Sequence, residues 1–448
     1  MIMVISSGLL LVMLGLLFVL AFIISKFDIL HPWVIICSMM TASALFACIG
    51  SYKWSYYISV DAALVVISAV IMFGIGAVWT DYYMGNKVIW DDSMNHDQYI
   101  ISNERLIVAI VLVLFFSYLQ VQETYRNSLL YGNTEGYWGM VRVMRKVIES
   151  NTFSYSRWRT YRTIIASSIM YCSLFTFLYN MIYSVKVYRI KAIKFLLPII
   201  SYFPFLLVSG GREGILEIVL FALMSGSILY GRKNKFSLTG NRKILLAFFL
   251  SCSGFIVLFL LFGFITGKVR IGGRGPLTII THYLGLSFPA LTLWLKKIPI
   301  ESPLIGSTTL MGIYGNLRTL GMKLPKVISF LPFVGFEGIS ENYVNTNVYT
   351  TMMRYIKDYG YVGMMLIMSF LGILYSFMYS FLKYRTKHLE LIAMYSTILM
   401  PLFFSMNDER FLMRVLTTAT VYKFVALFFT FKILVKQKNS LSNQVKVE

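Results

Sequence analysis

The chain has 448 residues, of which 57% are hydrophobic and 14% charged, and its mean hydropathy is +0.70. This composition excludes an ordinary soluble globular protein, because apolar runs near 20 residues recur along the chain and each could cross a bilayer core of about 30 Å. The net charge of +21 does not indicate nucleic-acid binding. Much of the excess lies in short loops between apolar runs, where Lys and Arg mark the cytoplasmic side.

An all-α polytopic membrane protein is therefore predicted, with about eleven spans and a range of ten to twelve. The first run, Ile2 to Ile24, has no basic region before it and no small-residue cleavage site, which indicates a helix rather than a signal peptide. The predicted spans are 2–24, 31–50, 60–80, 105–122, 163–184, 194–210, 214–231, 244–265, 360–382, 389–406 and 412–434.

Five segments follow from these spans. They are the N-terminal helices (1–122), an amphipathic segment (123–162), the central helices (163–266), a large loop (267–359) and the C-terminal helices with their tail (360–448). Sixteen cations lie in or beside three short loops and in the tail, which we assign to the cytoplasm. These are Lys186, Arg189, Lys191, Lys194, Arg232, Lys233, Lys235, Arg242, Lys243, Lys383, Arg385, Lys387, Lys432, Lys436, Lys438 and Lys446. The two long segments, 123–162 and 267–359, are then external. With a cytoplasmic C-terminus and an odd number of spans, the N-terminus is external too.

Two stretches of the long segments are expected to lie at or in the membrane. In "WGMVRVMRKVI", Val141, Met144 and Ile148 share one helical face and the cations lie elsewhere, which predicts an interfacial helix. The apolar stretch Pro276 to Leu295 is bracketed by Pro276 and Pro289, which favours a re-entrant or interfacial helix over a twelfth span.

No metal, cofactor or disulfide is expected. The four cysteines and the four scattered histidines lack metal-ligand spacing. The acidic stretch "WDDSMNHDQ" (90–98) falls on the cytoplasmic side and is expected to be an ordinary solvated loop. The cysteines fall inside apolar spans, which indicates small core residues. Two further ionisable residues lie within predicted spans, Glu217 and Lys423, and each is expected either to have a structural partner or to line a polar groove.

Arginines and glycines gather on the external side. "GKVRIGGRGPLTIITHYLG" (267–285) carries three cations and no acid near its start, and "GGRE" places Arg212 where a span begins. Arginine binds phosphate through a fork of donors, glycine permits close backbone approach, and a helix N-terminus attracts anions. Arg212, Arg270 and Arg274 are therefore expected to converge on a pyrophosphate, the alternative being contact with lipid headgroups.

The chain resembles the O-antigen polymerases of the Wzy type. The resemblance lies in "SGGREGILEIVL" (209–220), the arginine-rich loop and "NTNVYTTMMRYIKDYGYVG" (345–363). The last stretch matches the family's Asn-x-Tyr-Thr and Asp-x-Gly-x-x-Gly patterns at Asn347, Tyr349, Thr350, Asp358, Gly360 and Gly363. Arg274 to Gly285 also fits an Arg-x10-Gly pattern of some members.

This resemblance implies a metal-independent integral-membrane glycosyltransferase of GT-C-like architecture in the bacterial inner membrane. Its substrates would be undecaprenyl-pyrophosphate-linked glycans, and a polysaccharide chain-length regulator would be an additional partner. Fixed cations would stabilise the leaving pyrophosphate. Asn347, Tyr349, Arg354 and Arg410 are expected to contact glycan or pyrophosphate as well.

The acceptor hydroxyl needs a proton acceptor, for which Asp358 is the first candidate and His282 the second. The alternative for Asp358 is a structural role, either as a partner of Arg354 or as a helix-end residue. Two other functions remain open. One is an O-antigen ligase, which the sequence separates from a polymerase only through the motif at the end of the large loop. A lipid-linked oligosaccharide flippase would more often show repeated halves with corresponding helix breaks.

Overall fold

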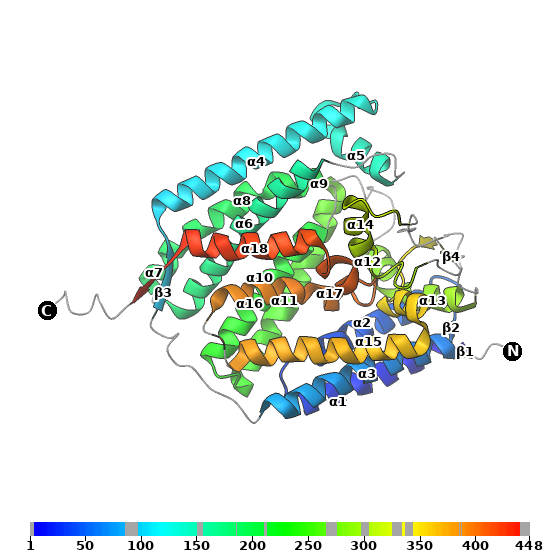
Figure 1. Cartoon of the computed structure of the whole chain (residues 1–448). Helices are drawn as coiled ribbons and strands as arrows, with labels where there is room; N and C mark the ends of the chain where they lie inside the picture. The colour runs from blue at the N-terminus through cyan, green and yellow to red at the C-terminus, as the bar shows by residue number, and fades with distance from the viewer. Residues whose placement is uncertain are drawn as a thin grey trace. The chain divides into compact units, whose positions relative to one another are not determined.

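A computed structural model shows a predominantly helical chain (Figure 1). The structure describes residues 4–85, 97–149, 156–184, 186–209, 213–265, 276–296, 304–324, 334–336, 344–384, 386 and 388–439. The chain divides into two compact units, and neither is continuous in sequence. The first unit comprises Met1–Ile89, Arg274–Arg385 and Ile398–Thr420, and the second comprises Trp90–Gly273, Thr386–Thr397 and Val421–Glu448.

The first unit is a helical bundle with two short strand pairs. Its strands are antiparallel: β1 (Val4–Ile5) pairs with β2 (Ile58–Ser59), and β4 (Val334–Phe336) pairs with β5 (Val344–Thr346). Its helices are α1 (Ser7–Ile24), α2 (Pro32–Ser51), α3 (Val60–Gly85), α12 (Pro276–Gly285), α13 (Ser287–Lys296), α14 (Met311–Thr319), α15 (Thr351–Tyr384), α17 (Met400–Phe404) and the π-helix η3 (Phe411–Val415).

Helices α3 and α15 pack closely side by side and run in the same direction (Figure 1). A Cβ added at Gly76 would lie 2.1 Å from the Ser369 carbonyl oxygen, and one added at Gly372 would lie 2.1 Å from that of Phe73. Small residues are the usual means by which helices approach each other in a membrane. With an external N-terminus, predicted spans 60–80 and 360–382 would both run inwards, which agrees with this parallel course.

Helix α15 has a sharp kink at Gly360, where φ is 70° and ψ is −177°. This backbone conformation is open to glycine and strained for residues with a Cβ. The kink separates the stretch 351–359 from the long apolar part, 361–384. The first stretch carries Arg354, Tyr355 and Asp358 and so determines the geometry of the candidate site.

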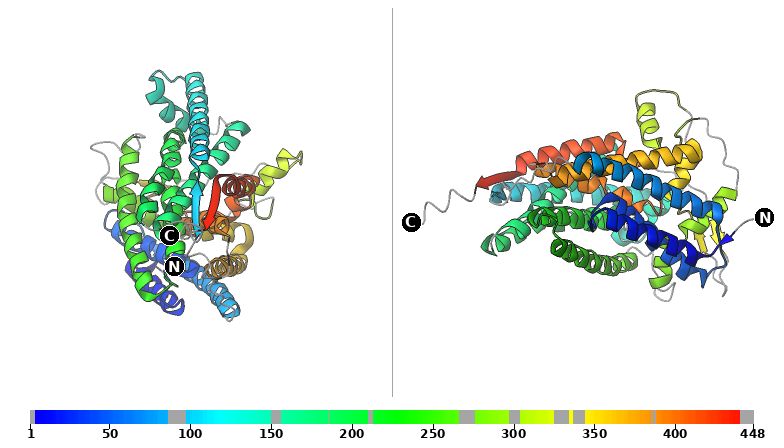
Figure 2. Two further views of the ribbon diagram at one scale, coloured as in Figure 1. Left: turned by 90° about the vertical axis from the view of Figure 1, so that its left-hand side faces the viewer. Right: turned by 90° about the horizontal axis from the view of Figure 1, so that it is seen from below.

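The second unit is also a helical bundle, closed at one end by the antiparallel pair β3 (Asp97–Ile101) and β6 (Val435–Asn439), which lie side by side in Figure 2. Its helices are α4 (Asn103–Leu130), α5 (Gly136–Glu149), α6 (Arg157–Tyr183), α7 (Lys186–Ala192), the 3₁₀ helix η2 (Ile193–Leu196), α8 (Leu197–Ser201), α9 (Phe203–Ser209), α10 (Glu213–Lys233), α11 (Leu238–Ile265), α16 (Leu389–Ile398) and most of α18 (Thr418–Leu434).

Eight helices of the described residues are long and apolar enough to cross a membrane, so the chain is an all-α multi-pass membrane protein. They are Ser7–Ile24, Pro32–Ser51, Val60–Gly85, Asn103–Leu130, Arg157–Tyr183, Val187–Ser209, Glu213–Lys233 and Thr351–Tyr384. The other predicted spans coincide with α11, with the shorter apolar stretch Leu389–Phe404 and with α18. The count of eleven stays a prediction.

The two predicted membrane-associated stretches are both helical. Helix α5 is amphipathic, but its buried side chains include Met140 and Met144, whereas Ile148 is exposed. Helices α12 and α13 form one apolar pair bent by 44° at the residue between them. α12 packs against α2 so closely that a Cβ on Gly285 would lie 2.6 Å from the backbone of Phe46. A re-entrant rather than a spanning course stays a prediction for this pair.

Candidate functional site

The candidate site lies in the first unit, where the start of α15 meets the turn 405–410. The backbone N–H of Thr351 donates to the carbonyl of Ser405 at 2.8 Å and so joins the two segments. The turn contains the sequence Asn-Asp-Glu-Arg and follows α17, whose apolar residues end at Phe404. Side chains from both segments form the Arg354 cluster, which we define as Arg354, Tyr355, Asp408 and Glu409.

Arg354 is 3% exposed and binds the Asp408 carboxylate at two points. Its Nε lies 2.6 Å from Oδ1, and its Nη2 lies 3.0 Å from Oδ2. Within the part of the chain that the structure describes, the third nitrogen, Nη1, is buried without a hydrogen-bond partner, as are Thr350 Oγ1 and Asn407 Oδ1. A buried donor without a partner costs about 1–3 kcal/mol, more on a charged group. Arg354 therefore has a charged donor available for a ligand.

Glu409 is fully buried and accepts three hydrogen bonds. Oε1 accepts from the Tyr355 hydroxyl at 2.9 Å and from the N–H of Leu412 at 2.7 Å, and Oε2 accepts from the N–H of Met413 at 3.0 Å. Burial raises the pKa of Glu409 to about 7, and the neighbouring Asp408 charge adds to the rise, while the three hydrogen bonds oppose it. The carboxyl group also caps η3, a π-helix of the kind often found at functional sites.

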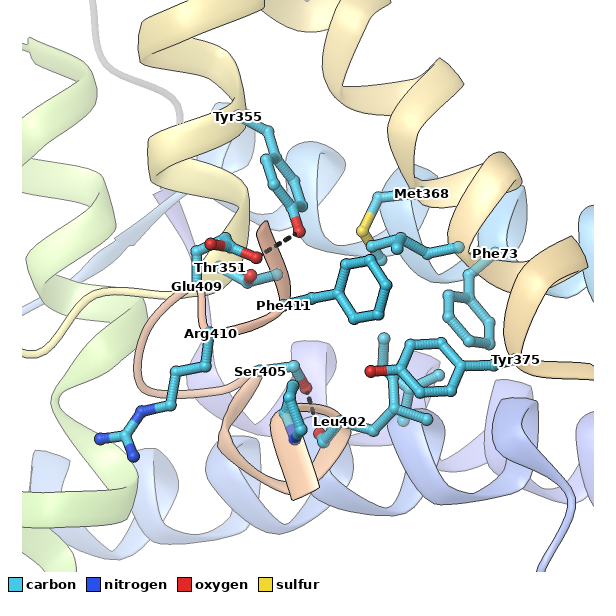
Figure 3. A pocket seen from close by; sticks show the side chains of 13 residues that line it. Phe73, Thr351, Tyr355, Met368, Tyr375, Leu402, Ser405, Glu409, Arg410 and Phe411 are labelled. Atoms are coloured by element: carbon cyan, nitrogen blue, oxygen red, sulfur yellow. Dashed lines mark hydrogen bonds between the residues drawn. The ribbon is translucent and has the colours of Figure 1, made fainter. Parts of the chain in front are cut away.

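A small cavity of about 20 Å³ adjoins the cluster, which is room for about one water molecule. Its polar lining comes from Thr351, Tyr355, Ser405, Glu409 and Arg410. Its apolar lining comes from Ile36, Phe73, Met368, Leu371, Tyr375, Pro401, Leu402 and Phe411. In Figure 3 the Tyr355 hydroxyl meets the Glu409 carboxylate, while the Arg410 guanidinium points away from the rings of Phe73, Tyr375 and Phe411. That guanidinium lies 3.8 Å from the centre of the Phe404 ring.

Asp358 is held by the segment 307–309 and not by Arg354. Its carboxylate accepts from five donor groups: the hydroxyls of Ser307, Thr308 and Thr309, and the N–H groups of Thr308 and Thr309, at 2.8 to 3.3 Å. The Thr309 hydroxyl is also 2.9 Å from that of Tyr359. These five donors occupy the acceptor positions of the carboxylate. This arrangement suits a residue that fixes a loop onto α15.

The remaining described candidates have different surroundings. Tyr349 is fully buried, and burial raises its pKa to about 12. Asn347 is half-buried in the stretch between β5 and α15. His282 lies on α12, and its ring is 5.6 Å from that of Tyr283. Arg212, Arg270 and Arg274 lie outside the described residues, so their convergence on a pyrophosphate stays a prediction.

Glu217 and Lys423 contribute to one cluster of the second unit. Lys423 Nζ lies 4.9 Å from the centre of the Tyr171 ring, and Glu217 is close enough to interact electrostatically with Tyr171 and Tyr202. Both ionisable side chains therefore lie near buried tyrosines, and the choice between a structural partner and the lining of a lipid-pyrophosphate groove stays open.

Sequence reasoning missed Asp408, Glu409 and Tyr355, and it missed the loop 307–309. The available signal was the turn Asn-Asp-Glu-Arg between two apolar runs, because two adjacent acids at a helix end suggest capping or ion pairing. Among the described residues, no group of three or more His, Cys, Asp or Glu could hold a metal ion.

No known protein family, no curated protein and no solved structure matches this chain. Its helices and buried polar cluster define a class, a helical multi-pass membrane protein with an ionisable site at the start of a kinked helix.

Proposed function

We propose that the chain polymerises undecaprenyl-pyrophosphate-linked oligosaccharide repeat units into O-antigen-type polysaccharide. The reaction would take place at the periplasmic face of the bacterial inner membrane. It would transfer a glycan from its lipid pyrophosphate to a sugar hydroxyl of a second lipid-linked unit. The carrier lipid would stay in the bilayer while its phosphates reach the N-terminal end of α15.

The observation that carries this proposal is the buried guanidinium of Arg354. Asp408 holds it by two nitrogens, while Nη1 has no hydrogen-bond partner among the described residues. A guanidinium fixed in this way is suited to a phosphate oxygen, because the pair with Asp408 determines its orientation in advance. Such a preorganised donor can stabilise the charge that develops on the leaving pyrophosphate without a metal ion.

The Arg354 cluster also lies at the N-terminal end of a long apolar helix. A lipid-linked substrate needs this combination, since its tail requires apolar surface and its phosphates require a charged site at the membrane boundary. The positive end of the α15 helix dipole at this terminus also favours an anion. The resemblance of the stretch 345–363 to the polymerases supports the same assignment.

Deletion of the gene tests the proposal against its alternatives. Electrophoresis of surface polysaccharide should show core carrying a single repeat unit. Polymer retained on the carrier lipid with bare core would indicate a ligase, and the absence of both products would indicate a flippase. Complementation with Arg354→Ala should fail, whereas Arg142→Ala, a change at an exposed arginine of α5, should restore the polymer.

A further inference from the structure

We propose that Glu409 is the proton acceptor of the transfer reaction and that it reaches the acceptor hydroxyl through the cavity it lines with Tyr355. The inference rests on the proposed function and adds the group that removes the proton. Neither Glu409 nor any other residue of the turn 405–410 was considered for this role from the sequence.

The geometry favours Glu409 over Asp358. Five donor groups bind the Asp358 carboxylate and occupy its acceptor positions, so it has no position left for a substrate hydroxyl. Among the described residues, three donors contact Glu409, two on Oε1 and one on Oε2. A carboxylate has about four lone-pair positions, so Oε2 retains one acceptor position. Glu409 also lines the cavity.

Charged and titratable groups from two elements lie around Glu409. Its own turn supplies Asp408 and Arg410, and α15 supplies the hydroxyls of Tyr355, Tyr359 and Tyr375. Helices α2 and α3 contribute apolar side chains to the cavity. Burial raises the pKa of Glu409 to about 7, so a large fraction is ionised at neutral pH. A proton acceptor works best when its pKa lies near the working pH.

The chemical step is balanced without a further reagent. The acceptor hydroxyl oxygen forms a bond to the anomeric carbon of the donor glycan, and the bond from that carbon to the pyrophosphate oxygen breaks. Its electron pair leaves with the pyrophosphate, whose charge Arg354 Nη1 would stabilise. The hydroxyl proton passes to Glu409, which becomes neutral and later returns the proton to water.

The test uses the purified full-length chain in nanodiscs. Its substrate is the lipid-pyrophosphate repeat unit extracted from cells in which the gene is deleted. Rates of glycan transfer are measured from pH 5 to 9 for the wild type, Glu409→Gln, Tyr355→Phe and Glu135→Gln. Glu135 is an exposed carboxylate beside α5 and provides the matched control. Substrate affinity is measured separately.

Glu409→Gln should lower the rate by about 100-fold or more and remove the rise of rate with pH near 7. Its affinity for the substrate should change less than threefold, and Glu135→Gln should match the wild type. Tyr355→Phe removes a hydrogen bond that lowers the pKa of Glu409. It should therefore remain active and shift the rise of rate to higher pH by about one unit.

Two failures can be told apart. A wild-type chain that transfers no glycan from this substrate would refute the proposed function itself. An active wild type whose pH profile is unchanged in both Glu409→Gln and Tyr355→Phe would overturn the assignment of Glu409 alone. If Glu409→Gln does not fold, the shift in Tyr355→Phe decides the question, because a merely structural hydrogen bond would not move the pH profile.

Discussion

Arg354 and Asp408 form a partly buried two-point ion pair between residues 54 positions apart, with contacts of 2.6 and 3.0 Å. The pair fixes the first turns of α15 against the turn 405–410. It also leaves Nη1 of the arginine without a hydrogen-bond partner in the described part of the chain. Removal of Asp408 would leave the buried guanidinium without its charge partner, which destabilises the fold, so conservative variants are the informative ones.

Arg354→Lys should keep the positive charge and lose most of the activity. The lysine ammonium cannot form the two parallel hydrogen bonds that the guanidinium makes to Asp408. It also cannot hold a further donor where Nη1 now lies. We expect the rate of polymerisation to fall by about 100-fold, the usual effect of losing one preorganised donor. Arg142→Lys on α5 is the control, and normal polymer from Arg354→Lys would remove this guanidinium from the site.

Asp358→Asn should act on stability more than on the reaction. The amide would direct N–H hydrogens at Ser307, Thr308 and Thr309, whose donors now bind a carboxylate. We expect a loss of about 1–3 kcal/mol in the free energy of unfolding, measured as a lower thermal midpoint in detergent. Polymer should still form at low growth temperature. Complete loss of polymer from a variant with wild-type stability would return Asp358 to the role of proton acceptor.

Gly76→Ala and Gly372→Ala should each separate α3 from α15. An added Cβ would lie 2.1 Å from a backbone carbonyl oxygen, which no side-chain movement can relieve. Overpacking of this kind costs about 1–3 kcal/mol. The control is Gly15→Ala in α1, where nothing lies within 4 Å. Equal thermal midpoints for all three variants would show that the two helices are not packed in this way.

Stability should depend on pH through Glu409. Its pKa is raised from 4.5 to about 7 in the folded protein, so the folded state binds the proton more tightly than the unfolded state does. The stabilising contribution of this proton is fully present below pH 4.5, falls as pH rises and is lost above pH 7. The whole effect is about 3 kcal/mol. Thermal midpoints of wild type and Glu409→Gln should therefore diverge between pH 5 and 8, and parallel curves would contradict the burial of an ionisable carboxyl group.

The sequence predicted the helical membrane class well, because runs such as 7–24 and 60–85 are too apolar and too long for another environment. It did not predict that α4 continues to Leu130, because the last turns of that helix are polar and carry no apolar signal. The kink at Gly360 was also missed. A glycine within a helical pattern is compatible with an unbroken helix. Whether it adopts a positive φ depends on the packing around it, which the sequence does not show.

The site was predicted in part. The stretch 345–363 was singled out, and it does contain Arg354 and Asp358. The partners of these residues could not be predicted, since Asp408 and Ser307 lie about 50 residues away on either side and periodicity carries no information on such contacts. Pairing of Arg354 with Asp358, the alternative to a catalytic role for Asp358, is not found, because the arginine binds Asp408 and the aspartate binds the 307–309 segment.

The central claim is that this chain alone joins lipid-pyrophosphate repeat units, and polymerisation by the purified protein tests it most directly. The chain in nanodiscs is supplied with extracted lipid-linked repeat unit in the presence of EDTA, and products are separated by electrophoresis. The account predicts a ladder of products that differ by one repeat, formed by the wild type and by Arg142→Lys but reduced about 100-fold with Arg354→Lys. No ladder from a folded wild-type chain, or a ladder that appears only when a divalent metal ion is restored, would contradict it.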